Sequence, residues 1–167
     1  LYTDYADDPG NTGILVISPE DLAKRMYKAY RHGLQPATHC IGDKALEVTL
    51  DAVEYCLEQG LKDGMTPEEQ AKRLPFRIIH AQMATPELIE RMKKLPIVLD
   101  IQPTFLMTDL HWIEERVGKE RAVLSYPWKT YLDAGLIMAG GSDAPVESFN
   151  PWIGIYATVT RQDMDGY

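Results

Sequence analysis

The stretch "ATHCIGDKA", residues 37–45, joins an apolar extended segment to the start of a helix. His39 closes the apolar run "LQPATH" (34–39), and Asp43 is placed to cap the helix "KALEVTLDAVEYCLEQG", which Gly60 should end. A strand that passes through a short loop into a helix is the unit of parallel β/α folds. One copy is compatible with an ordinary core histidine at a strand end, so the prediction depends on whether the unit repeats.

The unit occurs three more times along the chain. The apolar runs "FRIIH" (76–80), "IVLDIQP" (97–103) and "LIMAGGSD" (136–143) lack polar alternation, which is typical of strands covered on both faces. Helix starts with proline in the first turn are expected at Ser18, Thr66, Thr85 and Asn150. "YPWKTYLDAG" predicts a short helix that ends at Gly135, and the polar stretch 58–75 reads as a surface insertion. We therefore predict an α/β fold of parallel β/α units, in one domain over residues 1–167.

Composition narrows the class of protein. The chain has 167 residues, 45% of them hydrophobic, and a formal net charge of -8, which argues against a nucleic-acid-binding protein because that function needs a basic face. The basic residues are dispersed, and no apolar run reaches the ~20 residues of a membrane span, so no membrane partner is expected. Two cysteines without a CxxC motif favour a reducing, cytoplasmic location. The absence of an initiator methionine favours a fragment of a longer protein.

Chemically useful side chains stand where the four runs end. His39, His80, Gln102 and Asp143 close them in order. The carboxyl ends of strands in a β/α barrel point to one face, and two histidines with a carboxylate suit zinc or a similar divalent ion. Each residue alone has an ordinary explanation, as a core histidine or as an Asx-turn residue before Pro145. Their joint occurrence predicts that His39, His80 and Asp143 converge on one metal site.

Longer stretches carry a family resemblance. "YADDPGNTG", "THCIGDKALEVTLDAVE", "RIIHAQ", "QPTFLMTDLHWIEERVGKER" and "YPWKTYLDAGLIMAGGSDAPVESFNPWIGIYATVTRQDMDG" resemble, in order and spacing, the later part of the amidohydrolase superfamily. The most similar branch is its third large sequence family, which contains N-substituted formamide deformylases. The resemblance implies a metal-dependent hydrolase on a TIM-like (β/α)8 barrel. This chain would supply its C-terminal part, about strands five to eight.

The resemblance also implies residue roles. His39 and His80 match the metal-binding histidines that end the fifth and sixth strands. Asp143 matches the eighth-strand aspartate that binds metal and accepts a proton from the hydrolytic water. The implied reaction is hydrolysis of a C–N, amide-type bond in a small-molecule substrate, by water that a divalent metal activates, with zinc favoured.

Three further residues are candidates for substrate contact. Gln102 and Phe105 follow the third run and would lie beside the substrate, and Trp112, with His111, could form a pocket wall. Ordinary packing explains these residues equally well.

Two family features are absent. The histidines are His32, His39, His80 and His111, so no His-x-His pair exists, and no fourth-strand ligand is identifiable. We therefore expect the isolated chain to be inactive and to bind metal weakly or not at all.

Two other interpretations stay open. One is a non-catalytic binding or regulatory half-barrel with vestigial ligands. The other is a metal-free barrel that uses His39 and Asp143 as an acid/base pair. A half-barrel should also have open sheet edges at 34–39 and 136–143, with inner-face residues such as Ile79, Leu99 and Ile101 uncovered. We therefore expect a homo-oligomer, or crystal contacts, to cover these edges.

Overall fold

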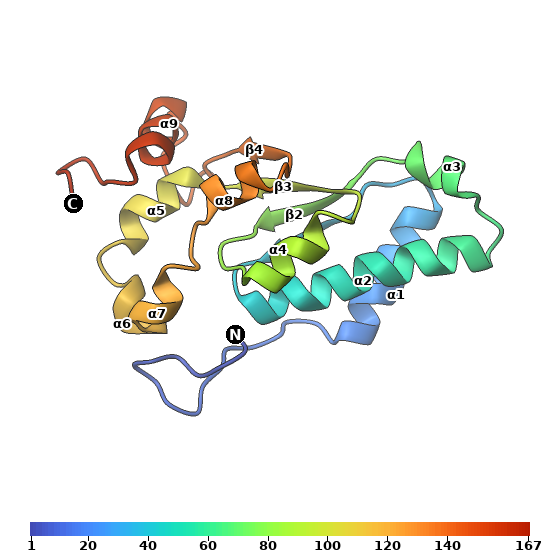
Figure 1. The fold of residues 1–167 in the computed structure, drawn as a ribbon, viewed down its shortest axis with the longest axis horizontal. Helices are drawn as coiled ribbons and strands as arrows, with labels where there is room; N and C mark the ends of the chain where they lie inside the picture. Colours follow the sequence, from blue (N-terminus) through green and yellow to red (C-terminus); the bar gives the residue numbers. More distant parts are fainter.

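Four parallel strands form the sheet of the computed structural model, which describes residues 1–167 (Figure 1). They are β1 (Ala37–Cys40), β2 (Phe76–His80), β3 (Ile97–Ile101) and β4 (Met138–Gly140). Their spatial order, β1-β2-β3-β4, equals their order in the chain, and every adjacent pair is parallel. The predicted α/β fold of parallel β/α units is confirmed, and so are the two open edges, at β1 and β4.

Nine helices accompany the sheet. They are α1 (Pro19–Arg31), α2 (Asp43–Lys62), α3 (Pro67–Ala71), α4 (Pro86–Met92), α5 (Pro103–Asp109), α6 (Ile113–Val117), α7 (Lys119–Ala122), α8 (Trp128–Asp133) and α9 (Pro151–Thr160). The four predicted caps are confirmed, because each side chain accepts a hydrogen bond from a backbone N–H of the first turn; they are Ser18, Thr66, Thr85 and Asn150. None of the helices has both the length and the apolar composition needed to cross a bilayer.

Helix α2 differs from its prediction at both ends. Its N-cap is Gly42, and Asp43 is instead its first residue, whose carboxylate accepts a hydrogen bond from the N–H of Tyr2 at 2.9 Å. The helix continues through Gly60 to Lys62, so its predicted end at Gly60 is wrong. A Cβ at position 60 would lie 2.5 Å from Nε2 of Gln70, so the glycine there permits a close approach of side chains. The predicted insertion 58–75 therefore begins inside the helix.

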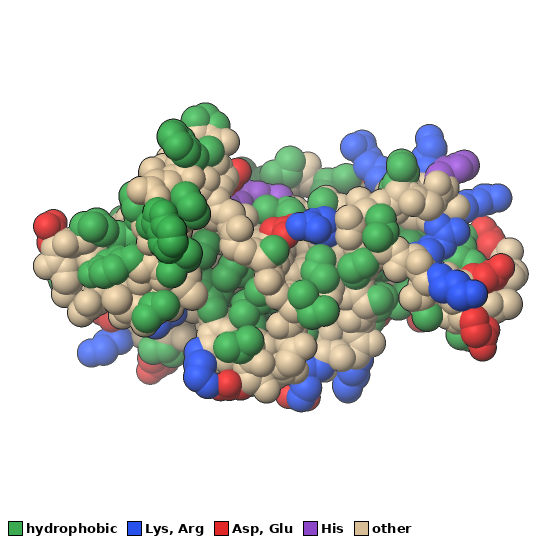
Figure 2. All heavy atoms as spheres, turned by 90° about the horizontal axis from the view of Figure 1, so that it is seen from above, with side chains coloured by type: hydrophobic (Ala, Val, Ile, Leu, Met, Phe, Trp, Pro, Cys, Tyr) green, Lys and Arg blue, Asp and Glu red, His purple; other side chains and the backbone are tan.

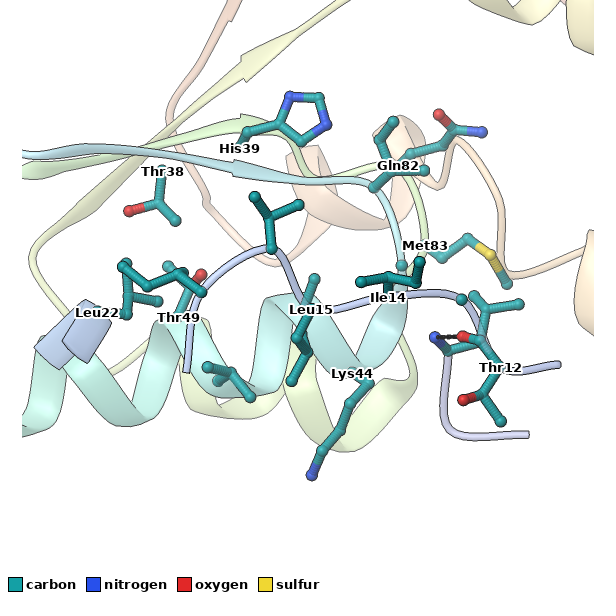
Figure 3. Close-up of a pocket in the computed structure, with 18 of the residues that line it drawn as sticks. Thr12, Ile14, Leu15, Leu22, Thr38, His39, Lys44, Thr49, Gln82 and Met83 are labelled. Atoms are coloured by element: carbon teal, nitrogen blue, oxygen red, sulfur yellow. Dashed lines mark hydrogen bonds between the residues drawn. The ribbon is translucent and has the colours of Figure 1, made fainter. Parts of the chain in front are cut away.

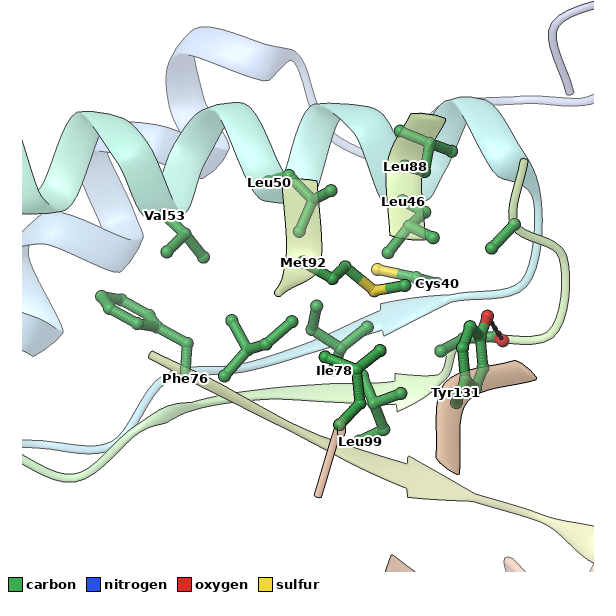
Figure 4. Close-up of a cluster of buried hydrophobic side chains, with 14 of the residues drawn as sticks. Cys40, Leu46, Leu50, Val53, Phe76, Ile78, Leu88, Met92, Leu99 and Tyr131 are labelled. Atoms are coloured by element: carbon green, nitrogen blue, oxygen red, sulfur yellow. Dashed lines mark hydrogen bonds between the residues drawn. The ribbon is translucent and has the colours of Figure 1, made fainter. Parts of the chain in front are cut away.

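The hydrophobic core lies between one face of the sheet and helices α1, α2 and α4 (Figures 1 and 4). Its fully buried side chains include Leu46, Leu50, Val53, Phe76, Ile78, Met92 and Leu99. Leu99 and Ile101 belong to this core, so the prediction that they are uncovered is wrong. Ile79, which alternates with Ile78, is only half-buried. An apolar run with no polar alternation does not indicate which residues face the helices, and this explains the error.

The opposite face of the sheet has no layer of helices and carries polar groups. Strand register places His39, Ile79, Asp100 and Ala139 in one row across it. In this face Arg77 of β2 pairs with Asp100 of β3 through two hydrogen bonds, one of them from Nε to Oδ2 at 2.7 Å. Figure 2 shows histidine side chains in a recess of the surface, beside adjoining acidic and basic side chains.

The segment before α1 is attached to the region that follows β3. Asp7 pairs with Nη1 of Arg116 at 2.7 Å, and the guanidinium of Arg116 lies over the Tyr5 ring. Arg121 donates to the Thr3 hydroxyl and to the Asp4 carbonyl, each at 2.6 Å. These contacts join residues more than a hundred positions apart and attach the segment to α6 and α7.

Two leucines of α2 test the position of the core. Leu50 is fully buried between α2 and the sheet, whereas Leu61, near the end of the same helix, is 50% exposed. Leu50→Ala should lower the free energy of unfolding of the intact protein by about 2–5 kcal/mol, because it leaves a cavity. Leu61→Ala should lower it by less than about 1 kcal/mol. Urea denaturation measures both, and equal losses would contradict this placement of α2.

Candidate active site

His39 is the penultimate residue of β1, one position before the observed strand end at Cys40, and His80 is the last residue of the neighbouring β2; their rings are in contact. The ring centroids lie 4.5 Å apart with an angle of 74° between the planes, an edge-to-face arrangement. His39 is exposed and His80 is buried. The site is therefore open to solvent on the β1 side and closed on the β2 side.

The backbone of His80 is unusual. His80 and Ala81 have φ values of 71° and 47°, a conformation that costs a non-glycine residue about 1 kcal/mol or more. By alternation His80 would point toward the helices with Phe76 and Ile78. Because φ is a rotation about the N–Cα bond, the positive value carries Cβ away from that direction, and the ring meets His39 instead.

Asp143 completes a group of three predicted residues. It lies three positions beyond β4, and its Oδ2 is 3.8 Å from Nε2 of His80. Its side chain is 46% exposed. The structure thus brings His39, His80 and Asp143 together at the carboxyl ends of the strands, with His39 and Asp143 each next to His80.

The donor types fit a divalent ion, although the three groups do not enclose one. Nowhere in the chain do three His, Cys, Asp or Glu side chains form a group that could hold a metal ion. The separation of 3.8 Å between His80 and Asp143 is nonetheless near the roughly 3.4 Å between tetrahedral ligands that lie about 2.1 Å from zinc. The metal-binding roles of the three residues stay predictions.

Electrostatics favour the neutral form of His80. Burial lowers its pKa, the neighbouring His39 lowers it further, and only Asp143 opposes the shift. A neutral imidazole is the form that binds metal, so the surroundings of His80 suit a ligand.

The predicted substrate residues lie in different environments. Phe105 packs edge-to-face on His80, with ring centroids 5.5 Å apart, and so belongs to the site. Gln102 is buried, and its Oε1 has no hydrogen-bond partner. Trp112 is exposed, whereas His111 bonds to Oδ2 of Asp163 at 2.8 Å and stacks on Tyr167. Contact of Gln102, Phe105 and Trp112 with a substrate stays a prediction.

A large open pocket adjoins the site. Its volume is about 1390 Å³, and 18 of its 29 lining residues are hydrophobic. Figure 3 shows His39 and Gln82 on one side of it, with Ile14 and Leu15 of the segment before α1 nearby. Trp112 also lines this pocket.

Three buried polar residues near the site are not among the predicted ones. Nε2 of Gln82 donates to Oδ2 of Asp109 at 3.0 Å, and the hydroxyl of Tyr126 donates to the same oxygen. Burial raises the pKa of the Asp109 carboxyl, and the two hydrogen bonds oppose the shift in part. The sequence gives only a weak indication of these residues: Gln82 ends the motif "RIIHAQ" and Asp109 ends "FLMTD", each as a polar residue after an apolar run.

Sequence comparison identifies relatives over nearly the whole chain. Residues 2–167 match the sequence pattern described as the Amidohydrolase family. The chain is 40% identical over 159 residues to YtcJ of Bacillus subtilis (strain 168), covering 95% of this chain and 28% of YtcJ. It is 37% identical over 163 residues to the Arabidopsis thaliana protein LONG AFTER FAR-RED 3, covering 96% and 26% of the two chains. It thus spans little more than a quarter of these relatives.

Structure comparison agrees. The crystal structure of an uncharacterized metal-dependent hydrolase from Pyrococcus horikoshii OT3 superposes with a TM-score of 0.81 at 36% identity. The match covers 95% of this chain and 29% of that protein. The fold therefore matches part of a metal-dependent hydrolase, as predicted; the numbering of its strands as five to eight stays a prediction.

The two cysteines should be unreactive in the native protein. Burial raises the pKa of Cys40 to about 11 and that of Cys56 to about 12, and the Cys40 thiol lies 2.9 Å from the Thr49 hydroxyl on the helix side of β1. At pH 8 iodoacetamide should modify neither thiol in the folded protein, because little thiolate is present. Both should react in urea, which mass spectrometry would record. Rapid native alkylation of Cys40 would place it on the side of His39.

Proposed function

The chain belongs to the amidohydrolase family, and we propose that it forms part of an active site that hydrolyses a C–N, amide-type bond of a small molecule. The observation that carries the proposal is that His39 and Asp143 both lie close to His80 at the carboxyl ends of the strands. Similarity to a metal-dependent hydrolase supports the same chemistry.

In the proposed site His39, His80 and Asp143 would hold a divalent ion, for which zinc is favoured by the donor set. When bound, such an ion lowers the pKa of water and polarises the scissile carbonyl. Asp143 is half-exposed beside His80 and accepts the proton of the attacking water as the new C–O bond forms. It then gives that proton to the leaving nitrogen as the C–N bond breaks, so the products are a carboxylic acid and an amine.

The residues of the chain explain only part of such a site. Three donors do not enclose an ion here, and the chain spans 28% of YtcJ. We therefore propose that residues outside positions 1–167 complete the ligand set. Residues 1–167 on their own should bind metal weakly and should not hydrolyse the substrate. Two buried, free thiols agree with the proposed cytoplasmic location.

Two substitutions in the intact protein separate metal binding from proton transfer. Asp143→Asn should keep most of the bound metal but lower turnover by a factor of about 10²–10⁴, because the amide cannot accept the proton. His80→Ala should instead lower the metal content. Elemental analysis and hydrolysis of a panel of N-formyl and N-acyl amines measure the two effects.

His32→Ala is the matched control, because His32 is exposed and lies between the end of α1 and the start of β1, whereas His39 lies near the carboxyl end of that strand. It should change neither quantity. Near-normal turnover of Asp143→Asn would remove Asp143 from proton transfer. An intact protein that holds no metal would favour one of the two open interpretations: the non-catalytic module if it is also inactive, or the His39–Asp143 acid/base pair if it hydrolyses amides.

A further inference from the structure

We propose that Asp109 is a positioning residue for His80. Through Gln82 and Tyr126, it holds the left-handed turn that directs the His80 ring toward His39 and Asp143. The inference rests on the proposed function, because it concerns a side chain proposed there to bind metal. It assigns a role to a buried carboxylate that is not itself at the site.

The turn needs external support. His80 and Ala81 are consecutive non-glycine residues with positive φ, and such a pair persists only where the surrounding structure holds it. Relaxation of His80 to a negative φ would turn its Cβ back toward the side of Phe76 and Ile78. The direction of the imidazole is therefore coupled to whatever fixes residues 80–84.

Contacts from one distant segment, residues 125–131, fix part of the turn. The N–H of Tyr126 donates to the carbonyl of Gln82 at 2.7 Å, and Met83 forms an isolated antiparallel bridge with Ser125. The hydroxyl of Tyr131 donates to the carbonyl of Ala81, also at 2.7 Å. The turn is thus held against residues more than 40 positions further along the chain.

Asp109 joins these two segments through side chains. A single oxygen, Oδ2, accepts from Gln82 of the turn and from Tyr126 of the supporting segment. All three side chains are buried, and no lysine, arginine or histidine forms an ion pair with Asp109. Loss of this oxygen leaves two buried donors unpaired and removes the link between the turn and its support.

The same carboxylate could instead act through its charge on a bound cation, and two substitutions separate these roles. Asn keeps an oxygen that can accept both hydrogen bonds but has no charge. Leu has a similar volume and no acceptor. A positioning role predicts that Asn preserves the site and Leu does not, whereas a charge effect predicts equal loss in both.

The experiment is a titration of the metal-free, intact protein with Co²⁺, followed by the visible absorption of the bound ion. Asp109→Leu should weaken Co²⁺ affinity about tenfold or more, as removal of the outer partners of ligating histidines does. Asp109→Asn should stay within about threefold of the wild type. Wild type and His80→Ala are titrated in parallel.

A pair of tyrosines supplies a matched control and a second route if Asp109→Leu does not fold. The Tyr126 hydroxyl donates to Asp109, and the Tyr27 hydroxyl donates to Asp63 at 2.6 Å, between α1 and the end of α2. Each Tyr→Phe change removes one hydroxyl bond to a carboxylate. Tyr126→Phe should weaken Co²⁺ binding and alter the absorption spectrum, whereas Tyr27→Phe should change only thermal stability.

The outcomes are distinct. If Asp109→Leu binds Co²⁺ with wild-type affinity, the positioning role is overturned and the proposed function stays intact. If Asp109→Leu does not fold, wild-type Co²⁺ affinity in Tyr126→Phe leads to the same conclusion. Equal loss in the folded Asn and Leu variants overturns it in favour of a charge effect. A wild-type protein that binds no Co²⁺ overturns the proposed function and this inference with it.

Discussion

The parallel register of the four strands is the constraint on which the rest of the structure depends. Because all adjacent strands are parallel, their four carboxyl ends lie at one end of the sheet, and residues from distant parts of the sequence become neighbours there. The same register divides the side chains between two faces. Phe76, Ile78 and Leu99 pack beneath the helices, while His39 and Asp100 lie on the face without them. Apolar burial and polar chemistry thus use alternate positions of the same short strands.

The site nevertheless depends on one departure from that regularity. His80 has the parity of a core residue, and only its left-handed backbone allows its ring to meet His39. The local conformation is unfavourable, so it is maintained by groups whose own positions are fixed elsewhere in the fold. Buried residues that contact no substrate can therefore be as necessary to the geometry of the site as the side chains at its centre.

Much of this arrangement could be predicted because its signals are local. Strand β2 has its predicted limits, and the caps at Ser18 and Thr85 form as expected, since capping uses residues within one turn. The prediction that Gly60 ends the helix was wrong because this glycine serves a tertiary contact: it allows the Gln70 side chain to approach the helix closely. The roles of Gln82 and Asp109 escaped sequence reasoning for a similar cause. They lie 27 positions apart, and their contact depends on the path of the intervening chain.

The attachment of the segment before α1 makes that part of the molecule sensitive to ionic strength. The Arg116–Asp7 pair is partly exposed, so dissolved ions screen it and weaken it as their concentration rises. Arg121 instead holds an uncharged hydroxyl and a carbonyl, which screening affects much less. Salt would therefore loosen the segment at Asp7 first and leave it tethered near Thr3. Because Tyr5 and residues 12–17 of the same segment line the pocket beside His39, one wall of that pocket is held in part by a contact that salt weakens.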